Sequence, residues 1–254
     1  MANITSQEIK VLREKSGAGI MDCKKALQEN NGDIEASISW LRKKGIAGAS
    51  KKSSRIASEG LVGFKKSDNL CCIIEVNSET DFVSKNSDFQ KFINELLEIA
   101  VKKRFTLDEL LSTSYDNKTN IDDALKNLIS KIGENIVIRR IKYLINNENK
   151  NIFGNYLHNK VDDNLGKIAC IVSVTANMKN DKTADLAKKI AMHIAASRPL
   201  SIEQEGIDSA LIEKEKEIFK SQLIEEGKPE NIIEKIVIGK VNKFLSEVTL
   251  LKQN

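Results

Sequence analysis

The spacing of apolar residues along the chain changes several times, and each change predicts a different kind of element. Over residues 1–45, apolar side chains recur every three or four positions in three short stretches, as in helices with one buried face. Thr5 and Glu8 fit a capping box at the start of the first predicted helix, and Gly32 fits the glycine that commonly follows the end of a helix, here the second one. The pattern predicts a three-helix module over residues 1–45.

The stretch after this module is basic and rich in small residues. No acidic residue occurs between Glu35 and Glu59, and we interpret residues 46–59 as a linker. Such a charge run is either a solvated tether or an electrostatic contact with a polyanion. No aromatic residue interleaves it to stack on bases, which favours the tether.

From residue 60 onward, the apolar residues alternate or run together as in strands. Two apolar runs joined by a polar turn predict a hairpin, which is followed by helices and by a strand over Ile136–Ile141. A second hairpin and helix repeat this order, so we predict two related subdomains over 60–146 and 147–200. Strand alternation also predicts that one of Arg139 and Arg140 faces inward and that at least one pairs with an acid.

The rest of the chain predicts a helical arm over residues 201–247. Two charged, helix-favouring segments are separated by Gly227-Lys228-Pro229, which is typical of a helical hairpin. Residues 248–254 are expected to return to the second subdomain, with a short strand over Val248–Leu251. The fold class is therefore α+β.

Composition narrows the classes of function. The chain has 254 residues, a net charge of +4 and four cysteines without paired spacing, so we expect reduced thiols in a cytoplasmic protein. The two histidines, His158 and His193, are far apart and lack metal-ligand spacing. The sequence has no phosphate-binding glycine loop, which makes an enzymatic function less expected. It also has no secretory signal and no membrane span.

One segment follows neither the helical nor the strand period. In the run Val76–Asn86, Phe82 and Val83 lie in a predicted loop without periodic apolar partners. Phe82 either folds back onto the core or stays exposed as an aromatic anchor for a partner. The local pattern leaves both interpretations open.

An ordered set of motifs, covering essentially the whole chain, resembles the bacterial elongation factor Ts family. The matching runs are Leu12-Arg13, Ser16–Leu27, Glu75–Val83, Lys131–Ile136, Arg139-Arg140 and Ala191–Ala196. The resemblance implies a guanine nucleotide exchange factor for elongation factor Tu, which acts without covalent chemistry and without a cofactor or metal of its own.

The resemblance also implies site residues. The N-terminal module, similar to a ubiquitin-associated domain, would dock on the partner's GTPase domain through Leu12, Arg13, Gly17, Ala18, Gly19, Ile20, Met21 and Lys24. Thr80, Asp81, Phe82 and Val83 would dislodge Mg²⁺ in the partner. Ile132 and Gly133 would support that contact, and His158 would hold another partner domain.

The same resemblance implies no membrane and no direct need for nucleic acid, and it implies that the arm can form a homodimer. Family members usually continue with a further C-terminal segment, so this chain is expected to lack it. Two rival functions stay open: an RNA- or ribosome-associated protein that uses the basic linker, and a hydrolase that uses carboxylates.

Overall fold

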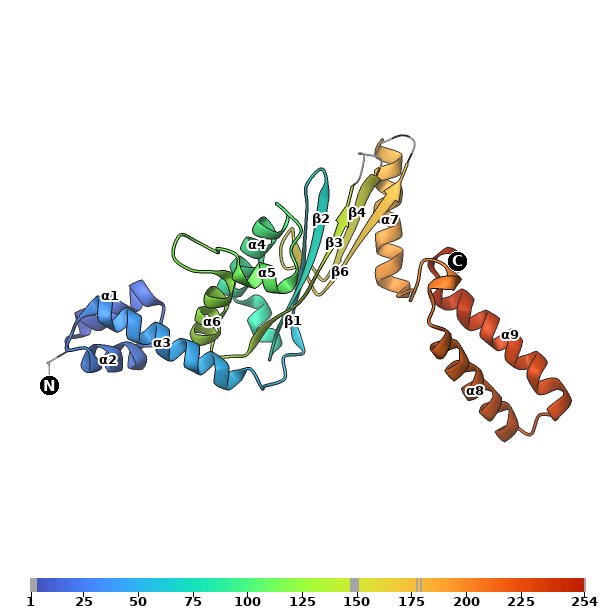
Figure 1. Ribbon diagram of the computed structural model, residues 1–254, viewed down its shortest axis with the longest axis horizontal. Helices are drawn as coiled ribbons and strands as arrows, with labels where there is room; N and C mark the ends of the chain where they lie inside the picture. The colour runs from blue at the N-terminus through green and yellow to red at the C-terminus, as the bar shows by residue number, and fades with distance from the viewer. Residues whose placement is uncertain (1–3, 147–150, 177, 179, 254) are drawn as a thin grey trace. The chain divides into compact units, whose positions relative to one another are not determined.

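The computed structural model describes residues 4–146, 151–176, 178 and 180–253, and it confirms an α+β fold (Figure 1). The helices are α1 (Ser6–Ser16), α2 (Ile20–Glu29), α3 (Ile34–Lys52), α4 (Ser87–Ala100), α5 (Leu107–Ser112), α6 (Ile121–Ile132), α7 (Asp181–Ser197), α8 (Ser209–Glu225) and α9 (Glu230–Val248). The strands are β1 (Glu59–Lys66), β2 (Leu70–Ser78), β3 (Ile136–Ile145), β4 (Asn151–His158), β5 (Leu165–Gly166) and β6 (Ile168–Thr175). The chain divides into two compact units, Met1–Ala187 and Lys188–Asn254.

The N-terminal module has the three helices that the apolar spacing predicts. Thr5 and Glu8 form the capping box of α1, and the side chain of Asp33 caps α3 by accepting a hydrogen bond from the Ala36 backbone at 2.9 Å. The chain leaves α1 through Gly17, whose φ of +67° is a left-handed conformation that glycine adopts without strain. The buried centre of the module consists of Leu12, Cys23, Ala26 and Leu27.

The third helix is longer than predicted, and it joins the module to the rest of the unit. It runs to Lys52, so half of the expected linker is helical. Its small residues allow close packing on α6: a side chain at Gly45 would lie 3.1 Å from the Ser130 hydroxyl, and Ala49 is buried in the main core. Glycine and alanine here provide close helix contact, whereas the sequence suggested a flexible tether.

This packing makes the effect of a truncation predictable. We expect a chain that begins at residue 56 to unfold more readily than one that begins at residue 34, by about 1–3 kcal/mol, because α3, with its buried Ala49, no longer covers α6. Chemical denaturation of both truncated chains measures the difference. Equal unfolding free energies would show that α3 adds nothing to the core.

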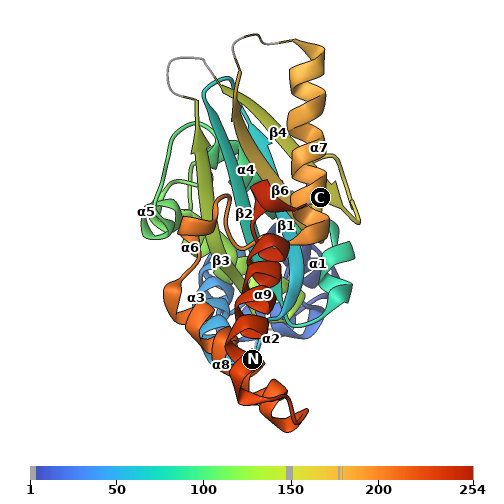
Figure 2. The ribbon, with the colours of Figure 1, turned by 90° about the vertical axis from the view of Figure 1, so that its right-hand side faces the viewer.

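Two sheets and their helices form layers in the first unit. The larger sheet has the antiparallel order β3-β2-β1-β5, and α4 and α6 pack on one face around a core that includes Phe89, Ile93 and Leu97. The β4–β6 hairpin packs on its other face around Phe64 and Leu157. The start of α7 covers that hairpin in turn (Figure 2), as Gly154 of β4 leaves no space for a side chain against Ala187.

The hairpin-then-helix order occurs twice, as the sequence predicts. The first copy is β1–β2 followed by α4, and the second is β4–β6 followed by α7. The turn of the second copy contains β5, a short strand that the sequence did not predict. Because β5 pairs with β1 at Val62 and Gly63, it ties the second hairpin to the larger sheet.

The cysteines are free thiols. Cys23, Cys71 and Cys72 are buried, and Cys170 is half-buried. Burial raises the pKa of Cys71 to about 12 and that of Cys72 to about 11, so both thiols stay protonated at neutral pH. Buried thiols that stay protonated are typical of cysteines that fill space in the core.

The prediction for Arg139 and Arg140 was half wrong. Both side chains are exposed, because β3 carries a bulge at this point: Glu75 pairs with Arg140 and Val76 with Ile138, which leaves Arg139 without a partner in the ladder. An extra residue shifts the alternation and turns both arginines outward. Arg140 does pair with an acid, Glu75, at 2.5 Å.

The second unit contains the predicted helical arm. Helices α8 and α9 pack through a small apolar core of their own, which includes Leu223, Ile233 and Val237. The expected strand over Val248–Leu251 was wrong. Helix α9 continues to Val248, and Thr249 makes a single β-bridge to Ser201. The short 3-10 helix η4 (Leu250–Lys252) follows, and its first two backbone N–H groups donate hydrogen bonds to the carbonyls of residues 201 and 202.

Candidate functional site

The loop after β2 presents one aromatic side chain to solvent. Phe82 is 75% exposed on the 3-10 helix η1 (Asp81–Lys85), whereas its neighbour Val83 is 3% exposed and belongs to the main core. Asp81 is also exposed, and Thr80 is half-buried. Of the two interpretations of Phe82, the structure supports the exposed one, and Val83 is the residue that folds onto the core.

The loop is held firmly on both sides of Phe82. After it, the Ser84 hydroxyl donates to the Gly60 carbonyl at 3.1 Å, and the Asn86 side chain caps α4. Before it, the backbone N–H and the hydroxyl of Thr80 donate to the two carboxylate oxygens of Glu134 at 2.9 and 2.7 Å. An exposed phenyl ring on an anchored loop loses little conformational freedom when a partner covers it.

The turn after α6 supplies these anchors. Gly133 ends α6 with a φ of +90°, which turns the chain so that Glu134 reaches Thr80. The next residue returns the contact, because the Asn135 backbone N–H donates to Glu79 at 2.5 Å. The expected support from Ile132 and Gly133 thus has a geometric basis. The sequence did not predict a role for Glu79 and Glu134, the acids that accept these hydrogen bonds. The sequence signal for Glu134 is an acidic residue directly after the glycine that ends a helix.

Replacing Glu134 by alanine tests this support. We expect the unfolding free energy to fall by about 1–2 kcal/mol, because two hydrogen bonds to a carboxylate are lost from a half-buried position. The Thr80–Lys85 amides should also exchange their hydrogens faster. Glu134→Gln, which keeps one acceptor oxygen, should lie between the two. Unchanged amide protection in Glu134→Ala would mean that the loop is held without this turn.

The N-terminal module presents a second apolar pair. Ile20 and Met21 begin α2, and they are 54% and 75% exposed. Arg13 and Lys24 are exposed too, while Ala18 packs partly on the core of the module. Leu12 differs from the expectation: it is completely buried as the centre of the three-helix core, because α1 turns its apolar face inward, so its side chain is not on the surface.

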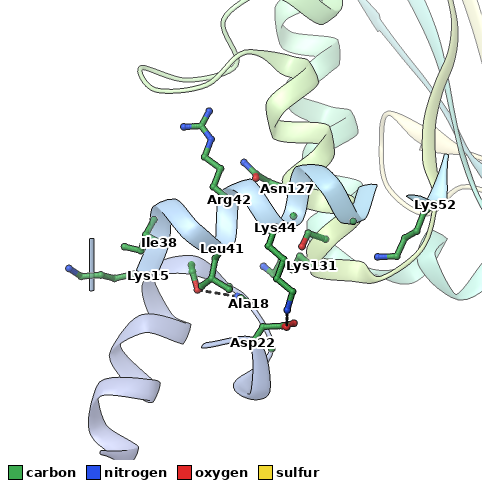
Figure 3. A pocket seen from close by; sticks show the side chains of 16 residues that line it. Lys15, Ala18, Asp22, Ile38, Leu41, Arg42, Lys44, Lys52, Asn127 and Lys131 are labelled. Carbon is green, nitrogen blue, oxygen red and sulfur yellow. Dashed lines mark hydrogen bonds and ion pairs between the residues drawn. The ribbon is translucent and has the colours of Figure 1, made fainter. Parts of the chain in front are cut away.

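A cavity of about 400 Å³ lies between this module and α6 (Figure 3). The loop Ser16–Gly19 forms one wall and Lys131 another; a side chain at Gly17 would lie 3.4 Å from Lys131. Lys131 also pairs with Asp88 of α4 at 2.8 Å. Through this lysine the glycine loop is linked to the helix that directly follows η1.

Three of the six cations in the basic stretch 42–55 are paired with acids of the chain. Arg42 contacts Asp123 at 2.7 Å, and Arg55 contacts Glu79 at 3.5 Å. Lys44 bonds to Asp22 at 2.5 Å across the mouth of the cavity, as Figure 3 shows. The basic stretch therefore carries less free charge than its sequence suggests.

His158 lies at the end of β4 and is exposed. Its Nδ1 lies 3.2 Å from the Tyr156 hydroxyl, and its carbonyl accepts a hydrogen bond from the Lys167 backbone at 3.0 Å. The Lys167 ammonium lies 3.1 Å from the Ser84 hydroxyl of η1. His158 is thus connected through one residue to the loop that carries Phe82.

Within the part of the chain that the structure describes, no group of three or more His, Cys, Asp or Glu residues could hold a metal ion. Among the same residues, no helix is both long and apolar enough to cross a bilayer. What the surface offers is exposed apolar side chains on anchored loops, which is the chemistry of a protein interface.

Sequence comparisons agree with the motifs. The sequence profile described as "Elongation factor TS" matches residues 79–254. A curated protein named elongation factor Ts from Allorhizobium ampelinum is 44% identical over 254 residues, which is all of this chain and 82% of that protein. Proteins of the same name from Rickettsia massiliae (46% over 253 residues) and Maricaulis maris (42% over 256 residues) each match 99–100% of this chain and 81% of their own length.

Proposed function

This chain belongs to the elongation factor Ts family of translation factors, and from that premise we propose that it promotes release of GDP from elongation factor Tu. The observation that carries the proposal is Phe82, an exposed aromatic side chain on a loop that is anchored at Thr80 and Ser84. Such a residue can insert into a partner and act as an interface anchor.

We infer that the inserted loop acts on the ions and loops that hold GDP. GTPases bind the diphosphate through a backbone cradle and through Mg²⁺, which neutralises the phosphate charge. Phe82 and the neighbouring carboxylate of Asp81 would displace the elements that position Mg²⁺, which weakens the hold on GDP. No bond is made or broken, so no general acid, general base or cofactor of this chain is required.

The other expected residues would supply docking. Ile20 and Met21 offer apolar surface beside the charges of Arg13 and Lys24 on the N-terminal module. His158, which is linked to the Phe82 loop through Lys167, would hold a further domain of the partner. Several contacts on one anchored framework allow docking energy to drive the insertion of Phe82.

Thermodynamic linkage gives a direct test. If this chain lowers the affinity of elongation factor Tu for GDP, GDP must lower the affinity of elongation factor Tu for this chain by the same factor. Calorimetric titration of the nucleotide-free and the GDP-bound partner measures that factor. Equal affinities for the two forms would rule out exchange by mutual destabilisation.

The rival RNA-binding function through residues 42–55 has less support, since Arg42, Lys44 and Arg55 pair with acids of the same chain. Homodimerisation through the arm stays a prediction. The apolar residues at its centre pack between α8 and α9. Exposed isoleucines such as Ile224 and Ile238 would have to form the dimer contact.

A further inference from the structure

We propose that the outer edge of β3, at the Arg139 bulge, is a binding site for phosphate groups. The strand is the last in the order β3-β2-β1-β5, so one of its edges is not paired within the sheet. A cavity of about 370 Å³ lies there, between the segment Arg104–Leu107 and the segment Arg139–Tyr143. It is separate from the Phe82 loop and from the N-terminal cavity.

The charge of this cavity is strongly positive. Arg104, Arg139, Arg140 and Lys142 line it, and no acidic residue does. Among the described residues, Arg104, Arg139 and Lys142 make no ion pair, whereas Arg140 is paired with Glu75. Lys142, like Arg140, also lines a second cavity, which contains Glu75. The unpaired Arg104 and Arg139 carry like charges at one hollow, and a ligand with several negative oxygens relieves their repulsion.

Two acids lie near the cavity: Glu75, which pairs with Arg140, and Glu109, whose charge acts on Tyr143. Glu109, at the start of α5, accepts hydrogen bonds from the backbone and the hydroxyl of Thr106 in a capping box. Those bonds lower the pKa of Glu109, but they hold its carboxylate at the helix start. The guanidinium groups of Arg104 and Arg139 are left free for a ligand, whereas that of Arg140 is paired with Glu75.

The chemistry favours phosphate. Guanidinium groups present paired N–H donors that match the oxygens of a phosphate, and Arg104 and Arg139, the residue at the bulge, both line the cavity. The aromatic residues present are Phe105, which is buried, and Tyr143, which is half-buried, so neither offers a free face for stacking on a base. The ligand is recognised through its phosphates, which belong either to a free nucleotide or to an RNA backbone.

The competing explanation is protection of the sheet edge. Charged side chains and bulges at an edge strand prevent pairing with other chains. On that explanation the variant Arg104→Gln/Arg139→Gln would self-associate, and neither the parent chain nor the variant would bind phosphate. The oligomeric state of the variant is therefore measured together with its binding.

The experiment uses the full chain alone, so its result is independent of exchange activity. Pyrophosphate is titrated by calorimetry, and labelled duplex RNA is titrated at several salt concentrations. We expect the double variant Arg104→Gln/Arg139→Gln to bind the phosphate probes roughly tenfold more weakly. For RNA, the slope of log affinity against log salt concentration should also be smaller in magnitude by about two. The matched control, Lys182→Gln/Lys188→Gln, removes the same charge from exposed positions of α7 and should bind as the parent does.

The outcomes separate the two sources of phosphate. Binding of pyrophosphate alone supports a free phosphorylated ligand, and binding of RNA alone supports a nucleic-acid backbone. The proposal is wrong if neither probe binds, if the control pair weakens binding equally, or if a polyglutamate peptide binds as tightly as the phosphate probes.

Discussion

Replacing Phe82 by alanine should slow the release of GDP from elongation factor Tu strongly while the protein stays folded. Truncating a desolvated aromatic anchor weakens an interface by about 2–4 kcal/mol. Because the ring is 75% exposed in the free chain, its loss should change the unfolding free energy by only about 0.5 kcal/mol or less. The rate of labelled GDP release and a denaturant titration measure the two effects.

Val83 provides the matched control at the next position. Its side chain is buried in the main core, so Val83→Ala should lower the unfolding free energy by about 1–3 kcal/mol. The exchange activity of the molecules that stay folded should be nearly unchanged. If Phe82→Ala lowers stability and Val83→Ala lowers exchange, the roles of these two neighbours are reversed and the proposed insertion is wrong.

The second large effect is expected at the N-terminal module. The double variant Ile20→Ala/Met21→Ala should bind elongation factor Tu about 1–3 kcal/mol more weakly, because two exposed apolar side chains would no longer be buried on docking. Alanine favours helices, so α2 should persist. Partner affinity by calorimetry and helicity by circular dichroism measure both parts.

Leu12→Ala separates docking from folding of the module. Leu12 is completely buried among Cys23, Ala26 and Leu27, so its truncation should destabilise the module by about 2–5 kcal/mol. Affinity would then fall together with helicity, whereas the Ile20→Ala/Met21→Ala pair should lose affinity alone. Full affinity in the double variant would remove α2 from the docking surface.

Much of this architecture follows from local sequence. The capping box at Thr5 and Glu8, the glycine after α1 and the apolar runs of β1 and β2 each reflect short-range chemistry that the sequence displays directly. The sequence could not decide whether Phe82 is buried or exposed, because the spacing of apolar residues predicts burial only in helices and strands, and Phe82 lies in a predicted loop. Only the tertiary packing of Val83 shows which of the two apolar neighbours faces the core.

The misinterpretations arose where a distant partner decides the local structure. The composition of residues 46–52 predicts a linker, but in the structure these residues belong to α3. The small residues Gly45 and Ala49 let α3 pack closely on α6, a contact that depends on the tertiary structure. The bulge at Arg139 is set by its register against β2, which no local pattern encodes. Glu134 likewise matters through its contact with Thr80, 54 positions earlier.

The activity that we propose for this chain is the release of GDP from elongation factor Tu. It is tested most directly by following fluorescently labelled GDP as it leaves elongation factor Tu, in excess unlabelled nucleotide, with and without the chain. We expect a release rate that rises with the concentration of the chain and that falls back strongly when the Phe82→Ala variant replaces it. A rate equal to spontaneous release at every concentration, or an equal acceleration by the Phe82→Ala variant, would contradict it.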